Sequence, residues 1–110
     1  GQYGGERMID STTIDLFTSI QLSPEQNRRG LGFDKPETLP DRTSPTCDGV
    51  PCTSYGHTGF TGAIAWNDPE NQLIYIFLSN RTYPNEFNTK LMKENIRTKI
   101  QEIIYESIGR

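Results

Sequence analysis

The residues best suited to chemistry form one run, 55–62, with the sequence Tyr-Gly-His-Thr-Gly-Phe-Thr-Gly. Its glycines alternate with hydroxyl, imidazole and aromatic side chains. Because glycine lacks a Cβ, such a strand lets a ligand approach its main-chain N–H groups, and a threonine hydroxyl adds a further hydrogen bond. The same pattern also fits a β-bulge with a single surface histidine. The residues alone therefore leave a binding site and a structural loop both open.

Cys47 and Cys52 are the second feature, and they bracket the turn-prone tetrapeptide Asp-Gly-Val-Pro. A disulfide between them would close a very short loop, contribute about 2 kcal/mol by restricting the unfolded chain, and suit a periplasmic or extracellular compartment. Two free thiols are the equal alternative. Two cysteines and one histidine are too few for most metal sites, since a structural zinc ion takes four such ligands. No cofactor is expected.

The composition indicates one small domain or a piece of a larger one. The chain has 110 residues, of which 33% are hydrophobic, so it can bury only one modest core. A net charge of −3 without a basic cluster argues against nucleic acid and anionic membranes as partners. No apolar run approaches the ~18 residues of a membrane span. The polar N-terminus does not read as a signal peptide.

Local patterns divide the chain into three parts. Residues 1–20 predict a glycine-rich loop and then a short helix, which begins after the capping residues of the run Asp-Ser-Thr-Thr. Residues 21–56 hold five of the seven prolines and are expected to be mostly irregular, with one short strand at 29–33. Residues 57–110 predict a strand, a hairpin and a terminal helix.

The hairpin comprises strands at 61–66 and 73–78 around a turn dense in Asn, Asp and Pro. The second strand is six apolar residues without alternation, so both its faces are expected to be covered, as at the centre of a sheet. Apolar residues at helical spacing over 86–107 predict one long amphipathic helix, which can cover only one face. We expect the short helix near residues 14–17, or a second copy of the chain, to cover the other. The simplest account is that part of the domain is missing.

The ordered combination of these features resembles the end of a serine β-lactamase-type domain. His-Thr-Gly at 57–59 is followed by Phe-Thr-Gly, then by the hairpin that ends in Ser-Asn-Arg at 79–81, then by the long terminal helix. The segments 3–17 and 31–34 are also similar to those that precede this box in the family. The family includes class C β-lactamases, penicillin-binding DD-peptidases and related esterases. The resemblance covers nearly the whole chain, but only the last third or so of a complete domain.

In this family the His-Thr-Gly or Lys-Thr-Gly box lies on the strand that edges the active site. The resemblance implies that His57 is its cationic or hydrogen-bonding residue, that Thr58 contacts the substrate carboxylate, and that Gly59 belongs to the same substrate-binding box. It also implies that the backbone N–H of Phe60 is one of two oxyanion-hole donors, a contact whose loss typically costs ~3–4 kcal/mol. Histidine in place of lysine makes the charge depend on pH. Such variants are similar to esterases and peptidases at least as often as to β-lactam hydrolases.

Two other boxes of the family are missing from the sequence. None of the seven serines has a lysine three residues later, although the family nucleophile lies in Ser-x-x-Lys. Tyr-x-Asn occurs only at 83–85, after the His-Thr-Gly box and so in the wrong order, and we interpret it as chance. The chain holds one wall of a catalytic site and no nucleophile.

These observations predict an α+β fold, a partial antiparallel β-sheet packed against a long C-terminal helix, with residues 1–110 as the C-terminal portion of one β-lactamase-like domain. The predicted function is part of a serine hydrolase that acts on β-lactam, peptide or ester acyl groups through an acyl-enzyme. The alternative is a non-catalytic binding or interaction module, including one appended to a glycoside hydrolase of family 3. Expected partners are a small-molecule or peptidoglycan-like substrate, the rest of the parent domain and, for the fragment, a second copy. The expected location is periplasmic or extracellular.

Overall fold

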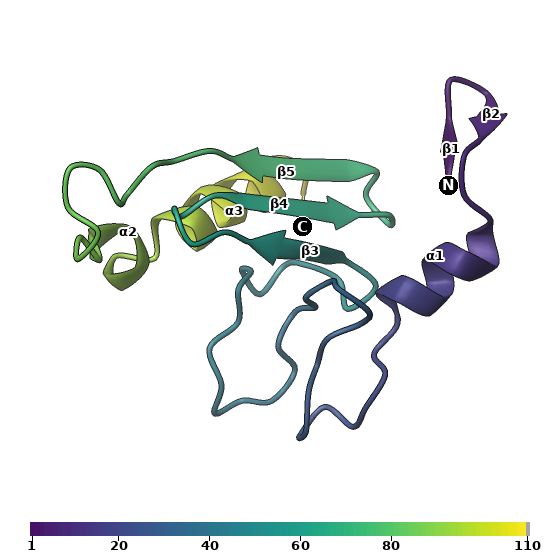
Figure 1. The fold of residues 1–110 in the computed structure, drawn as a ribbon, viewed down its shortest axis with the longest axis horizontal. Coiled ribbons are helices and arrows are strands. Elements are labelled where there is room, and N and C mark those ends of the chain that lie inside the picture. Colours follow the sequence, from purple (N-terminus) through teal and green to yellow (C-terminus); the bar gives the residue numbers. More distant parts are fainter. Residues whose placement is uncertain (110) are drawn as a thin grey trace.

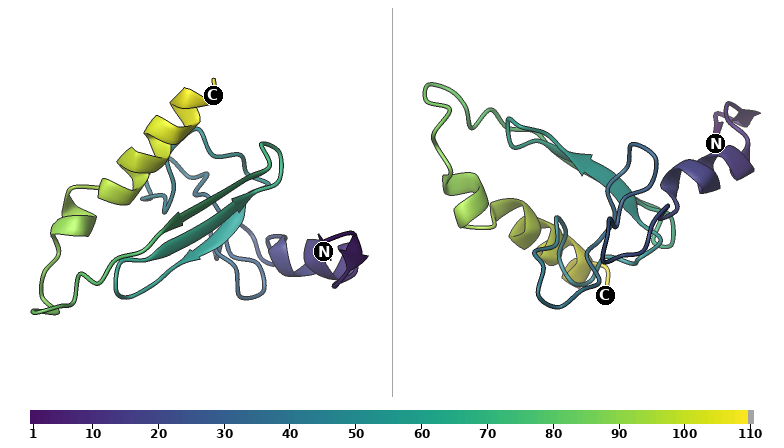
Figure 2. Two further views of the ribbon diagram at one scale, coloured as in Figure 1. Left: turned by 90° about the horizontal axis from the view of Figure 1, so that it is seen from above. Right: turned by 60° about the horizontal axis from the view of Figure 1, so that its bottom comes forward.

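The hairpin predicted from the apolar runs is the centre of the structure, a computed structural model that describes residues 1–109. Strands β3 (Tyr55–Thr58), β4 (Ile64–Asp68) and β5 (Leu73–Phe77) form one antiparallel sheet in that order. Helix α3 (Ile96–Ser107) packs on one face of this sheet (Figures 1 and 2). The predicted α+β class, with a partial antiparallel sheet and a C-terminal helix, is confirmed.

The core lies between the sheet and α3. Trp66 on β4 pairs in register with Gly56 and Tyr75 on the two neighbouring strands, so all three lie on the face toward the helix. The fully covered apolar side chains are Val50, Ile64, Trp66, Tyr75 and Tyr105. A Cβ on Gly56 would come within 2.5 Å of the Trp66 ring. Glycine is therefore required at this position so that the indole can lie flat across β3.

The N-terminal part lies beyond the end of the sheet at which β3 begins (Figure 1). It comprises a small hairpin of β1 (Gln2–Tyr3) and β2 (Glu6–Arg7), followed by helix α1 (Ser11–Thr18). Both views of Figure 2 place this part outside the layer formed by the sheet and α3. None of the helices in the described part of the chain is long and apolar enough to cross a membrane.

The segment between α1 and β3 is irregular, as predicted, but the short strand expected at 29–33 is wrong. Only a single bridge forms there, one residue later, where Asp34 and Gly56 exchange backbone hydrogen bonds of 2.7 and 3.1 Å. Gly32 has a φ of +80°, which breaks the extended conformation that a strand needs. The loop is held instead by Arg28, which pairs with Asp34 at 2.8 Å and with Glu37 at 3.2 Å.

The predicted boundaries of the hairpin and of the terminal helix need correction. The strand expected at 61–66 begins only at Ile64, because residues 59–63 form a tight turn closed by the Gly59 N–H and the Ala63 carbonyl at 2.8 Å. The single helix expected at 86–107 is two, α2 (Lys90–Lys93) and α3. Asn95 separates them with a left-handed φ of 52°, a conformation that asparagine tolerates better than most residues.

The prediction that β5 is a central strand with two covered faces is also wrong. Among the described residues β5 is an edge strand. Its side chains alternate between the two faces of the sheet: Tyr75 is buried toward α3, while Ile74 and Ile76 on the other face are 66% and 60% exposed. The α1 helix does not cover that face, because a hydrogen bond from the Leu31 N–H to the Phe17 carbonyl ties its end to the loop beside β3. The exposed face of β5 therefore has no cover within residues 1–109.

Candidate functional site

The His-Thr-Gly box occupies the end of β3, and its first two side chains lie on opposite faces of the sheet. His57 pairs with Ala65 and is exposed on the face away from α3. Thr58 pairs with Ile64 and lies on the face toward α3, half-buried. This follows from the alternation of a strand, in which successive side chains point to opposite sides. The structure therefore does not bring the His57 ring and the Thr58 hydroxyl into one pocket.

The imidazole of His57 has one partner, the carbonyl oxygen of Thr58, at 2.8 Å from Nδ1. A carbonyl oxygen can only accept, so Nδ1 carries a proton and donates in this bond. The neutral ring then presents Nε2 as an acceptor toward solvent. His57 can therefore form a hydrogen bond through Nε2 to a group outside the described residues.

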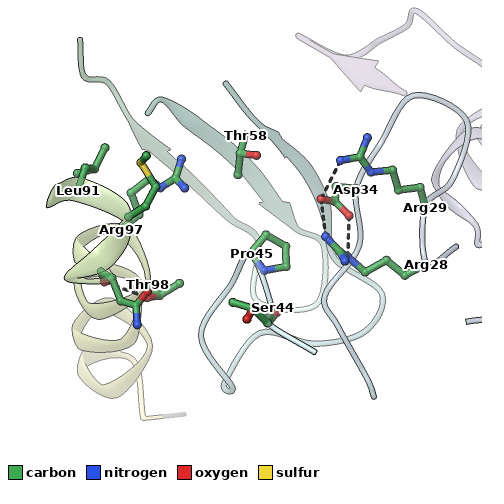
Figure 3. A pocket seen from close by; sticks show the side chains of 12 residues that line it. Arg28, Arg29, Asp34, Ser44, Pro45, Thr58, Leu91, Arg97 and Thr98 are labelled. Carbon is green, nitrogen blue, oxygen red and sulfur yellow. Dashed lines mark hydrogen bonds and ion pairs between the residues drawn. The ribbon is translucent and has the colours of Figure 1, made fainter. Parts of the chain in front are cut away.

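Thr58 lines a polar pocket of about 310 Å³ between the loop before β3 and the start of α3 (Figure 3). Arg28, Arg29 and Asp34 lie on one side of this pocket, and Arg97 comes from α3 on the other. Asp34 is paired with both Arg28 and Arg29, the latter at 3.5 Å.

Arg97 carries a charge that no carboxylate in residues 1–109 neutralises within ion-pair distance. Its Nη1 donates instead to the carbonyl oxygens of Gly62 and Ala63, at 3.0 and 3.4 Å. Three guanidinium groups thus line the pocket, while Asp34 and Glu37 compensate only two of them. This balance suits an anionic group of a ligand.

The turn after β3 presents the backbone N–H of Phe60. The Gly59 and Gly62 N–H groups donate within the turn, to Ala63 and to Gly59 at 2.8 and 3.0 Å. The Phe60 N–H has no acceptor among the described residues. The Phe60 ring is 73% exposed and lies 4.7 Å from the Arg81 guanidinium. An N–H without an acceptor at the end of a strand is available to donate to a ligand, as an oxyanion donor must be.

A nucleophile is not found in the part of the chain that the structure describes. No serine hydroxyl there is hydrogen-bonded to a histidine or a lysine. Ser79, near the turn, donates to the Thr61 carbonyl at 3.0 Å, and Ser54 is buried. Residues 1–109 also contain no cluster of three or more His, Cys, Asp or Glu side chains that could hold a metal ion.

The two cysteines are free thiols in the structure. Cys47 is half-buried and its backbone N–H donates to the Gln101 side-chain oxygen at 3.1 Å. Burial raises the pKa of the Cys47 thiol, because the thiolate is the less favoured form away from water. Cys52 is exposed. A disulfide between them stays a prediction.

Sequence reasoning missed the arginines of this site. Arg97 lies in the segment 86–107, where the apolar spacing predicts a helix but does not single out this arginine, and the ion pairs of Arg28 join residues of an irregular loop whose path local sequence does not define. The sequence carried no signal for Arg97. Arg97 is the second residue of α3, where the helix dipole disfavours a cation, but the single helix predicted at 86–107 placed it in mid-helix.

Comparison with known proteins places these features in a family. The Beta-lactamase family model matches residues 10–95. Proteins provisionally named D-alanyl-D-alanine carboxypeptidase from Salmonella typhi, Salmonella paratyphi B and Salmonella newport are each 32% identical to the chain over 97 residues, which is 83% of this chain and 20% of theirs. The chain thus spans about a fifth of the length of these relatives. No solved structure matches it. Because the family model covers most of the chain, with the His-Thr-Gly strand and the loops on both sides of it, the chain belongs to the β-lactamase family.

Proposed function

We propose that this chain forms one wall of the active site of a serine hydrolase that acts on acyl groups through an acyl-enzyme. The observation that carries the proposal is the unbonded Phe60 N–H, directly after His-Thr-Gly on a strand end, in a chain of the β-lactamase family. The relatives' names favour a peptide ending in D-alanyl-D-alanine as substrate. A β-lactam or an ester is then an alternative acyl donor for the same site.

The chemical role of the chain is to stabilise charge. When a serine oxygen attacks the substrate carbonyl, the C=O bond becomes a single bond and its oxygen takes the negative charge. The Phe60 N–H donates to that oxygen, which typically lowers the barrier by ~3–4 kcal/mol. The serine, the base that takes its proton and the second donor are contributed by residues outside this chain.

The Thr58 pocket supports a substrate with a free carboxylate. The Thr58 hydroxyl makes no hydrogen bond within the described residues, so it is available to donate to a ligand. Arg29 and Arg97 line the same pocket and give it the positive charge that a terminal carboxylate requires. His57, on the other face of β3, would act there as a cationic or hydrogen-bonding group toward the part of the site that this chain does not contain.

We further infer that the rest of the polypeptide covers the exposed face of β5. Ile74 and Ile76 form an apolar surface on this face. In addition, β5 is an edge strand of the described sheet, and it carries no charge, proline or bulge that would protect its free edge. The relatives are about five times longer than the matched region, so they contain enough chain for this. A periplasmic or extracellular location fits a hydrolase that acts on peptidoglycan-like peptides.

The test uses the complete polypeptide that contains these residues. A peptide ending in D-Ala-D-Ala is compared with the same peptide as its C-terminal amide. Thr58→Val is expected to lower kcat/KM about 10–100-fold for the free acid and to change it little for the amide, since only the acid carries the charge that Thr58 binds. Thr38→Val, at an exposed threonine that does not line the pocket, is the matched control.

Two results would contradict the proposal. An equal loss on both peptides would remove Thr58 from the carboxylate contact. A wild-type polypeptide that neither cleaves these peptides nor is acylated by a penicillin would refute the hydrolase itself, and would favour the non-catalytic binding module.

A further inference from the structure

The turn that carries Phe60 is held by residues far along the sequence. Arg97, in the first turn of α3, donates through Nη1 to the carbonyl oxygens of Gly62 and Ala63 at 3.0 and 3.4 Å. One side chain thus binds two consecutive peptide groups of a five-residue turn. Such a charged donor fixes both peptide planes more firmly than a neutral one.

Residues after β5 hold the other side of the turn. The Ser79 hydroxyl and the Arg81 N–H both donate to the Thr61 carbonyl, each at 3.0 Å. Gly62 fits between these groups only because it lacks a side chain: a Cβ there would lie 2.6 Å from the Ser79 Oγ and would also overlap Leu91. The turn is therefore clamped between α3 and the segment after β5, and each of its three last carbonyls has a partner.

This clamp determines where the Phe60 N–H points. Phe60 follows Gly59, whose N–H is bonded to Ala63, and the Gly62 N–H returns to Gly59. The Gly59–Phe60 peptide plane is thus enclosed by a ring of hydrogen bonds whose far end, residues 62 and 63, is held by Arg97. An oxyanion donor accelerates a reaction only if it is aimed before the charge develops. Without the Arg97 bonds to residues 62 and 63, the Gly59–Phe60 peptide would rotate, and the Phe60 N–H would no longer be held toward the substrate oxygen.

The position of Arg97 also argues for a role outside its own helix. As the second residue of α3 it lies at the end where the helix dipole disfavours a cation. The described residues offer it no carboxylate within ion-pair distance. Its charge is used on the turn.

We propose that Arg97 is a positioning residue for the oxyanion hole: it orients the Phe60 N–H through the carbonyls of Gly62 and Ala63 without touching the substrate oxygen. The inference rests on the proposed hydrolase function. It adds a residue on the terminal helix to the site and predicts that loss of the Arg97 guanidinium lowers the rate of acylation.

The test is made in the complete polypeptide with p-nitrophenyl acetate, a neutral ester. It carries no carboxylate, so any effect of Arg97 on the Thr58 pocket is left out. Arg97→Met is expected to lower the acylation rate constant, measured from the p-nitrophenolate burst, about 10–100-fold, which is less than the ~10²–10³-fold cost of deleting a donor outright. The dissociation constant of the unreacted ester should stay within about twofold. Lys99→Met, which removes an exposed charge from the same helix, should leave both values unchanged.

A second readout separates positioning from loss of structure. Phenylboronic acid forms a tetrahedral adduct with an active-site serine that mimics the intermediate, and its inhibition constant should rise by the same factor as the acylation rate constant falls. Ser79→Ala, at a half-buried residue on the other side of the turn, should have a smaller effect of the same kind. Because Ser79→Ala removes only one hydroxyl group, this variant keeps the test valid if Arg97→Met fails to fold.

The outcomes are distinguishable. If the wild-type polypeptide gives no burst with the ester or with a penicillin, the proposed function fails. If the wild type is active and both variants keep the wild-type acylation rate constant and boronate affinity, the function stands and the role of Arg97 is refuted. A fall in activity that only matches a smaller folded fraction, with unchanged rate constants for the folded part, would likewise overturn the positioning role.

Discussion

Asp68 joins the hairpin to the terminal helix, and its removal should destabilise the fold strongly. Its carboxylate is 1% exposed and accepts from the Tyr105 hydroxyl at 2.5 Å, although the two residues are 37 positions apart. It also accepts from the side chain of Asn71 at 2.6 Å and from the backbone N–H groups of Glu70 and Asn71 at 3.0 and 3.1 Å. One side chain thus closes the turn between β4 and β5 and anchors α3.

The expected loss for Asp68→Ala follows from these contacts. The donors of Glu70 and Asn71 lie in a turn that water can reach, so losing Asp68 costs them little. Tyr105 is only 2% exposed, and its hydroxyl loses a hydrogen bond to a charged group, a bond of about 1.5–3 kcal/mol. The broken hydrogen bonds of the turn add a smaller loss, so we expect Asp68→Ala to lower the free energy of unfolding by about 3 kcal/mol. At about 0.23 kcal/mol/K of unfolding entropy for 110 residues, this lowers the Tm by roughly 13 °C.

The contribution of Asp68 should depend on pH in a defined direction. Burial opposes its ionisation, but the hydrogen bonds from Asn71 and Tyr105 outweigh burial and hold its pKa below the usual value. Because the folded pKa lies below the unfolded one, the stabilisation is complete above about pH 4 and is lost as the pH falls through the folded pKa. Asp68→Asn should therefore be less stable than the wild type at pH 7 and should lose less stability on acidification.

Urea unfolding followed by tryptophan fluorescence measures this directly, since Trp66 is the only tryptophan of the chain and is buried in the same core. Asp48→Ala, at an exposed aspartate, is the matched control and should change the free energy of unfolding by less than about 0.5 kcal/mol. A loss below about 1 kcal/mol for Asp68→Ala, or the same loss at pH 3 and pH 7, would refute the reasoning.

Three further predictions concern the site and the thiols. The 110-residue chain on its own should not be acylated by a fluorescent penicillin, because an oxyanion donor without a nucleophile has no intermediate to stabilise; labelling at a stoichiometry near one would contradict this. In the complete polypeptide, His57→Ala should lower kcat/KM while the Tm stays within a few degrees, since the ring is exposed and bonds only to the next carbonyl; unchanged kinetics would remove His57 from the site. Iodoacetamide at pH 8 should alkylate the exposed Cys52 faster than Cys47, whose thiol pKa is raised by burial; peptide mass spectrometry measures both rates, and two thiols that react only after reduction would reveal a disulfide instead.

Several features of this protein could be predicted from the sequence because they depend on neighbours in the chain. The hairpin follows from two apolar runs around a turn, and the terminal helix from apolar residues at helical spacing. The His-Thr-Gly box and the order of the segments around it indicated the family, which the match over residues 10–95 confirms. The alternation of any extended strand also explains why Tyr75 is buried while Ile76 is exposed.

Other features depend on contacts between residues that are far apart in the sequence. A run of six apolar residues does not reveal what covers each of its faces, so the sequence could not decide whether α1 covers the second face of β5. Asn95 separates α2 from α3 because it adopts a left-handed conformation. The regular spacing of apolar residues over 86–107 gives no sign of this break. Arg97 reaches a turn 35 positions earlier, and Asp68 reaches a tyrosine 37 positions later. Such contacts depend on how α3 crosses the sheet, and that is set by the packing of Trp66 and Tyr105 in three dimensions rather than by any local pattern.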